Sequence, residues 1–285
     1  MKIALVQQSA GPDRARNLER ALDAMGHAAA AGARLVAFPE LAIDRFFPQR
    51  RNNPAAADLA EPIPGPASDR IAARAAELRL VTVFNQYELG PDGRCYDSSP
   101  VFDADGSLLG VTRMMHITEY ACFHEQHYYA KGDTDALVYD TAAGRVGVAI
   151  CYDRHYPEYM RRLGELGAQL VVIPQAGSVG EWPEGLFEAE LRVAAFQNGY
   201  FAALCNRVGE EPRLTFAGES FVVDPEGVVL ARGPEGQETI LYADVDLAQC
   251  ETSTARRLFW RDRRPEVYAR WAEPLLPASA PAPVP

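Results

Sequence analysis

Short apolar runs of strand length alternate with longer segments of helix length from residue 3 to residue 245. The runs at 35–38 (LVAF) and 146–150 (VGVAI) are apolar throughout, which is typical of strands buried on both faces. Alternation of this kind predicts an α/β protein whose sheets are covered by helices. We expect strands at 3–8, 35–38, 80–87, 100–103, 108–112, 145–150, 170–173, 200–206 and 239–245, and helices at 14–31, 67–78, 157–166 and 184–198.

Two turn sequences predict hairpins within this alternation. Asp105–Gly106 separates two strand-like runs, and a DPEG turn at 224–227 has the same character. Hairpins add antiparallel pairs, so the sheets are expected to be mixed. Because no linker or short repeat interrupts the pattern, residues 1–276 are predicted to form one domain. The tail at 277–285 (PASAPAPVP) is expected to be disordered or loosely extended.

Charge and composition exclude several classes of function. A net charge of −11 opposes long-range attraction of nucleic acid. No apolar run approaches the roughly 18–20 residues that span a bilayer, and the first residues enter a strand without a secretory signal. The five cysteines are scattered without a CxxC pair, which fits a reduced compartment. We therefore expect a cytoplasmic protein that acts on a small molecule, with neither nucleic acid nor membrane as a partner.

Two chemically useful side chains directly follow predicted buried strands. Glu40 comes after the strand at 35–38, and Cys151 comes after the strand at 146–150. Functional groups collect at the carboxyl ends of strands in open α/β sheets. A cysteine before a helix N-terminus is in a place that favours a thiolate, and a nearby carboxylate can accept the thiol proton. The alternatives are an exposed strand-end glutamate and a packed core thiol.

A third group of polar residues lies in an irregular connection at 113–129. Glu125 is a potential second acid there. A metal site built from Cys122, His124 and His127, with His116 nearby, is an alternative. The spacing matches neither HExxH nor paired CxxC motifs, so we predict no metal.

Taken together, these motifs resemble the nitrilase superfamily of carbon–nitrogen hydrolases. The likeness runs from about residue 2 to residue 250, with the motifs in the family's order. It is carried by Phe38-Pro39-Glu40, Arg113-x-Met115-His116, Glu125, Tyr129-x-x-Gly132-Asp133, the CYDRHYPE segment at 151–158, Trp182, Glu190, Arg192 and Asn206–Gly209.

This resemblance implies a four-layer α-β-β-α sandwich that commonly pairs into a homodimer or a higher homo-oligomer. It also implies Cys151 as the nucleophile and Glu40 as the general base. Glu125 matches a second glutamate that positions groups around the acyl intermediate, and the backbone N–H of Tyr152 would contribute to the oxyanion site. Members of this family need no metal or organic cofactor.

The CYDRHYPE segment is closest to the N-carbamoyl branches, including β-ureidopropionase and N-carbamoyl-amino-acid hydrolases. There the basic residues after the cysteine help to hold the substrate carboxylate, which assigns Arg154 and His155 to the substrate site; Gln175 is also assigned to it. A guanidinium suits a carboxylate bidentately. Alternatively, Arg154 pairs with a neighbouring acid, Asp153 or Glu158.

One position departs from the family pattern. The family usually has Arg-Lys-x-His, with the lysine stabilising the tetrahedral intermediate, whereas residues 113–116 read RMMH, with Met114 at the lysine position. A thioether cannot donate a hydrogen bond, and losing one oxyanion donor costs about 10²–10³ in rate. Three explanations stay open: another cation, Arg113 or Lys131, takes over; the chain is a substituted form; or it has kept binding and lost hydrolysis.

The function we predict is cysteine-dependent hydrolysis of an amide or N-carbamoyl substrate through a covalent Cys151 acyl-enzyme. The alternatives are a hydrolysis-deficient binding or regulatory protein on the same fold, for which Met114 is the main argument, and an amide transferase.

Overall fold

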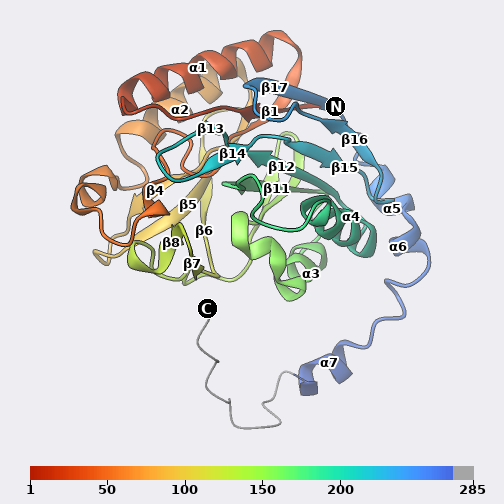
Figure 1. Ribbon diagram of the computed structural model, residues 1–285. Coiled ribbons are helices and arrows are strands. Elements are labelled where there is room, and N and C mark those ends of the chain that lie inside the picture. Colours follow the sequence, from red (N-terminus) through yellow and green to blue (C-terminus); the bar gives the residue numbers. More distant parts are fainter. Residues whose placement is uncertain (272–285) are drawn as a thin grey trace.

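The first of two large sheets in the computed structural model has seven strands, in the order β17-β1-β2-β3-β5-β4 with β6 beside β5 (Figure 1). β1, β2 and β3 are parallel neighbours, and the remaining pairs are antiparallel. The structure describes residues 1–271, so the predicted disordered tail at 277–285 lies outside the described residues. The strands are β1 (Lys2–Gln7), β2 (Ala33–Ala37), β3 (Val81–Val83), β4 (Gln86–Leu89), β5 (Cys95–Phe102), β6 (Leu108–Arg113) and β17 (Thr239–Asp244).

The second sheet has six strands in the order β16-β15-β12-β11-β10-β9. β10, β11 and β12 are parallel, and the outer strands are antiparallel. Both sheets are therefore mixed, as the hairpin sequences predict. The strands are β9 (Val138–Thr141), β10 (Gly144–Val148), β11 (Leu170–Gln175), β12 (Phe201–Asn206), β15 (Phe221–Val223) and β16 (Val229–Arg232).

Helices cover the outer face of each sheet, and the inner faces pack on each other. Successive side chains of a strand point to opposite faces, so Leu5 of β1 enters the core between the sheets while Val6 packs under the helices α1 and α2. On β11, Val172 faces the inter-sheet core and Val171 faces α3 and α4. These layers confirm the predicted α-β-β-α sandwich. The helices are α1 (Arg14–Ala30), α2 (Pro66–Leu78), α3 (Pro157–Glu165) and α4 (Leu186–Asn198).

The remaining elements are short. They are η1 (Phe47–Gln49), η2 (Pro54–Leu59), β7 (Glu119–Tyr120), β8 (Phe123–His124), η3 (Glu125–His127), η4 (Cys151–His155), β13 (Val208–Glu210), β14 (Thr215–Ala217), α5 (Gln249–Thr252), α6 (Thr254–Arg257) and α7 (Pro265–Trp271). The strand predicted at 80–87 is in fact two strands, β3 and β4, because the chain breaks from the ladder at Phe84 and Asn85. Within residues 1–271, no helix combines the length and apolar character that crossing a membrane requires.

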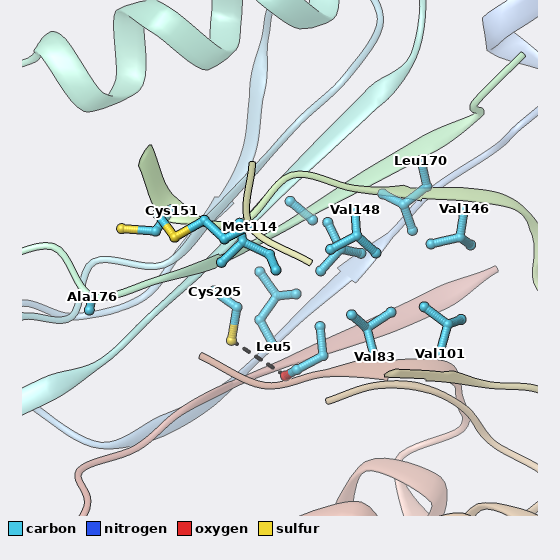
Figure 2. Close-up of a cluster of buried hydrophobic side chains, with 14 of the residues drawn as sticks. Leu5, Val83, Val101, Met114, Val146, Val148, Cys151, Leu170, Ala176 and Cys205 are labelled. Carbon is cyan, nitrogen blue, oxygen red and sulfur yellow. Dashed lines mark hydrogen bonds between the residues drawn. The ribbon is translucent and has the colours of Figure 1, made fainter. Parts of the chain in front are cut away.

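Leu5 tests how far the sandwich depends on its inter-sheet core. The Leu5 side chain is fully buried among strands of both sheets (Figure 2). Leu5→Ala is expected to lower the free energy of unfolding by about 2–5 kcal/mol, since it removes buried apolar contacts and leaves a cavity. The control is Leu230→Ala on β16, where the side chain is 43% exposed and the expected loss is below about 0.5 kcal/mol. Equal losses for the two variants, measured by urea unfolding, would contradict this packing.

Candidate active site

Glu40 lies just beyond β2, in a turn that the rest of the chain holds in place. Its side chain is fully buried, and the next residue, Leu41, has a positive φ of 47°. The Leu41 N–H donates to Asn85 Oδ1 at 2.6 Å, while Arg207 Nη1 donates to the carbonyl oxygens of Glu40 and Leu41 at 2.9 and 2.6 Å. The turn is therefore anchored by two buried polar side chains, Asn85 and Arg207, that lie in connections between other strands.

Cys151 begins the short 3-10 helix η4 just after β10. Its φ is 42°, an uncommon conformation for a residue with a side chain and one that costs of order 1–3 kcal/mol. The Cys151 carbonyl accepts from Arg154 Nη1 at 2.8 Å, which helps to hold the turn. Only 6% of the residue is exposed. Strained backbone of this kind often occurs at functional sites.

The structure brings Glu40, Cys151 and Glu125 together from three separate segments. The Glu40 carboxyl lies beside the Cys151 thiol and the Asp97 carboxyl, close enough to interact with both. Both Glu40 oxygens are buried, and neither receives a well-formed hydrogen bond within the described chain. Glu125, at the start of η3, is fully buried and interacts electrostatically with both Glu40 and Cys151.

Burial dominates the protonation of this cluster. It raises the pKa of Glu40 to about 8, with a further contribution from Glu125. Burial also raises the pKa of Glu125 well above its usual range, with Asp97 as the next cause. The pKa of the Cys151 thiol is likewise raised by burial and then by the two glutamates, against a smaller opposing effect from Arg154.

The structure therefore favours a protonated Cys151 thiol rather than the preformed thiolate that we expected before a helix N-terminus. The element after Cys151 is a single 3-10 turn, and its dipole is outweighed by burial and by neighbouring carboxyls. The arrangement instead suits transfer of the thiol proton to Glu40 during attack. Tyr152 is the second residue of η4, where backbone N–H groups have no acceptor within the helix.

Met114 is fully buried in the same inter-sheet cluster as Cys151. Figure 2 shows both side chains at one end of this cluster, away from Val146 and Leu170. Neither cation that we considered as a replacement for a lysine enters the site. Arg113 is paired with Glu88 and Asp133, and Lys131 is exposed.

Arg154 and His155 both pair with Glu190, an acid that the sequence did not single out as their partner. Arg154 Nε lies 3.4 Å from Glu190 Oε2, and His155 Nδ1 lies 2.6 Å from Glu190 Oε1. Arg154 Nη1 also donates to Gln175 Oε1 at 2.9 Å. Arg154 Nη2 and Gln175 Nε2 are buried without a partner in the described chain, and Arg154 Nε has no hydrogen bond beyond its ion pair with Glu190. The set is thus partly committed to the protein itself, with donor atoms left unpaired.

Aromatic rings flank Cys151. Tyr120 packs against Tyr152 and Trp182, and Trp182 packs against His155. Tyr120 donates to Glu181 Oε1 at 2.5 Å, and its hydroxyl is close enough to Cys151 for the two to interact electrostatically. Rings of this kind provide rigid apolar walls around a small ligand.

The alternative metal site receives no support from the geometry. Among residues 1–271, no group of three or more His, Cys, Asp or Glu side chains is arranged to hold a metal ion. His124 instead contacts Glu119 at 2.9 Å, and Asp153 accepts from the backbone and ring of His116.

Sequence reasoning missed Asp97, Asn85 and Tyr129, although all three are buried beside Glu40 or its turn. Asp97 occupies an inward position on β5, a strand whose start lies outside the strand predicted at 100–103. An acidic residue in a segment of strand length is the only signal that the sequence offers, and it does not say what the residue faces.

Comparison with known proteins agrees with this geometry. The carbon–nitrogen hydrolase family matches residues 2–255. A citrullinase of Francisella tularensis is 32% identical, over 94% of this chain and 96% of its own. An N-carbamoylputrescine amidase of Solanum lycopersicum is 29% identical, over 93% of each chain.

Solved structures give the same result. A carbon–nitrogen hydrolase from Helicobacter pylori has a TM-score of 0.89 at 30% identity, over 96% of this chain and 98% of its own. An amidase variant from Nesterenkonia sp. AN1, with acrylamide added at its active-site cysteine, has a TM-score of 0.80 at 26% identity, over 95% and 99%. The chain therefore belongs to the carbon–nitrogen hydrolase family, within the nitrilase superfamily, and is a hydrolase of the amidase or carbamoylase type.

Proposed function

We propose that this protein hydrolyses a small amide or N-carbamoyl compound through an acyl-enzyme on Cys151. The observation that carries the proposal is that the buried Glu40 carboxyl, which has no well-formed hydrogen bond within the described chain, lies beside the Cys151 thiol. It places a base with a raised pKa beside a nucleophile that needs to lose a proton.

The proposed reaction has two halves. Cys151 Sγ attacks the carbonyl carbon while Glu40 takes the thiol proton, and the backbone N–H of Tyr152 donates to the developing oxyanion. Glu40 then protonates the departing ammonia or amine, which leaves a thioester. In the second half Glu40 removes a proton from water, the hydroxyl adds to the thioester carbonyl, and the thiol is released with the proton returned. Glu125, kept neutral by burial, can donate a hydrogen bond to the acyl group.

The substrate class follows from the unpaired donors and from the relatives. Arg154 Nη2 and Gln175 Nε2 are free to bind a substrate oxygen, and two relatives carry names that refer to citrulline and N-carbamoylputrescine. We therefore favour an N-carbamoyl substrate. If Arg154 and His155 hold a substrate carboxylate, Arg154 binds it through Nη2, because Nη1 donates to Cys151 and Gln175 and Nε pairs with Glu190.

A homodimer or higher homo-oligomer is also part of this proposal. The apolar side chains of Val193 and Leu186 on α4 are 52% and 38% exposed beside a cavity between α3 and α4. Burial of such a face by a second copy would be favourable. Light scattering of the purified chain tests this assignment, and a monomer at micromolar concentration would contradict it.

Met114 favours a second candidate, a binding protein or amide transferase that has lost efficient hydrolysis. A buried thioether beside Cys151 supplies neither charge nor a donor to an oxyanion. Transferase activity would appear as an amide product when amines are added to the reaction. Binding without ammonia release would identify the non-catalytic alternative.

Cys151→Ala is expected to abolish ammonia release from a panel of carbamoyl and amide compounds, because no acyl-enzyme can form. The control is Cys95→Ala, which removes a more accessible thiol and is expected to retain activity. Iodoacetamide should modify the Cys151 peptide faster as the pH rises, in step with ionisation of the cluster. Wild-type-like turnover by Cys151→Ala would refute the proposed function.

The pH profile tests the role of Glu40 and the consequence of Met114. The base must be ionised, so kcat/KM of the wild type is expected to rise up to a pH of about 8, the pKa of Glu40. Met114→Lys adds a cation that favours the Glu40 carboxylate, so this acid limb should move to lower pH. At pH 7 the variant should gain about tenfold or more in kcat/KM. Met114→Leu, which adds no charge, is the matched control. An unchanged acid limb in Met114→Lys would contradict this electrostatic account.

A further inference from the structure

Asp97 is a buried carboxyl that the proposed reaction does not use. It lies on β5 with no exposed surface, and its backbone carbonyl accepts from the Met114 N–H at 2.9 Å. Its side chain lies beside the Glu40 carboxyl, close enough for the two to interact, and both Glu40 oxygens are buried without a hydrogen-bond donor in the described chain. Asp97 therefore lies between the Glu40 carboxyl and the end of β6, which Met114 follows.

Asn85 fixes the orientation of Asp97 relative to the Glu40 turn. Asn85 Nδ2 donates to Asp97 Oδ1 at 2.6 Å and to Ser99 Oγ at 3.0 Å. The Oδ1 atom of the same amide accepts from the Leu41 N–H at 2.6 Å. The Asn85 amide is therefore paired at both its nitrogen and its oxygen, and Asp97 Oδ1 has a hydrogen-bond donor. The other, Oδ2, is buried without a donor in the described chain.

Two ionised carboxylates cannot hydrogen-bond with each other, because both only accept. The contact between Asp97 and Glu40 therefore requires one shared proton. Burial first, and then Glu40, raise the pKa of Asp97 well above its usual range. The hydrogen bond from Asp97, in contrast, lowers the pKa of Glu40. Both effects favour the arrangement in which Asp97 keeps the proton and Glu40 ionises.

The surroundings offer little positive charge to reverse this order. Glu125, Asp153 and Tyr129 interact electrostatically with Asp97, and Arg207 is the cation that acts on Glu40. The other nearby titratable groups are Cys151, beside Glu40, and His116, which is paired with Asp153.

We propose that Asp97 is a positioning residue for Glu40: its neutral carboxyl donates a hydrogen bond that holds the Glu40 carboxylate toward the Cys151 thiol. This inference rests on the proposed function, since it assigns Glu40 as the base. It also bears on Met114. Because Met114 supplies neither a charge nor a hydrogen-bond donor, Asp97 is the residue that donates to Glu40 on this side of the site.

The decisive comparison is Asp97→Asn with Asp97→Leu. An asparagine reproduces the protonated acid, since its oxygen can accept from Asn85 and its N–H can donate to Glu40, whereas leucine can do neither. Asp97→Leu should move the acid limb of kcat/KM upward by about 1–2 pH units, so that kcat/KM at pH 7 falls about 10- to 100-fold. The variant should lose kcat while its KM stays close to that of the wild type. The loss of kcat/KM should become smaller at pH values above the acid limb.

Asp97→Asn should rescue the profile, with its acid limb near the wild-type position. Asp140→Asn, which removes a carboxylate that is 86% exposed on β9, controls for general loss of negative charge. The proposal would be overturned if the acid limb of Asp97→Leu stayed at the wild-type position. It would also be overturned if the acid limb of Asp97→Asn shifted as far as that of Asp97→Leu. If the wild type itself shows no turnover, the proposed function fails, and the next experiment still decides the protonation of Asp97.

Unfolding by urea at pH 5, 7 and 9 tests the proton on Asp97 without any catalysis. A carboxyl whose pKa is raised on folding contributes stability that is present below its unfolded pKa of about 3.8 and is lost as the pH rises toward the folded pKa. Asp97→Asn removes this titration. Its free energy of unfolding should therefore rise relative to that of the wild type as the pH increases. A difference that stays constant with pH, or one that falls, would show that Asp97 is ionised in the native protein and would overturn the proposal.

Discussion

The contact between the Glu40 carboxyl and the Cys151 thiol is the interaction on which the site depends. It forms between the two sheets, because Glu40 follows β2 of the first sheet and Cys151 follows β10 of the second. Face-to-face packing of the sheets therefore sets the distance between the proposed base and the proposed nucleophile. It also excludes water, and the same burial raises the pKa of each partner.

Burial makes the protonation of the cluster a collective property. Glu40, Asp97 and Glu125 are all fully buried, and each affects the pKa of at least one other member. A site of this kind cannot hold three negative charges, so two of the carboxyls are expected to act as neutral hydrogen-bond donors while one ionises as the base. Met114 strengthens the need for neutral carboxyls, because it adds no positive charge to the cluster.

Much of the fold could be predicted from the sequence, because the strands that carry the core have simple patterns. The apolar runs of β2 and β11, the helix α1 after Asp13 and the hairpin of β5 and β6 all follow from local rules of period and turn chemistry. The positions of Glu40 and Cys151 at strand ends could also be predicted from the sequence. The break at Phe84 and Asn85 could not, since tertiary hydrogen bonds between Asn85 and both Leu41 and Asp97 decide it.

The partners within the site were harder to predict for the same reason. Glu190 of α4 pairs with Arg154 of η4, and Asp97 meets Glu40 across strands that are far apart in the sequence. No spacing rule predicts such contacts. The positive φ of Cys151 is likewise set by the surrounding structure rather than by local propensity.

In the proposed reaction, Cys151 carries the acyl group during turnover. Rapid acid quench of the wild type with a slowly hydrolysed amide, followed by peptide mass spectrometry, measures this directly. The peptide containing Cys151 should gain the mass of the acyl group, in an amount that rises early in the reaction and then stays constant while ammonia is released. Steady ammonia release with an unmodified Cys151 peptide, or with the acyl group on another residue, would contradict it.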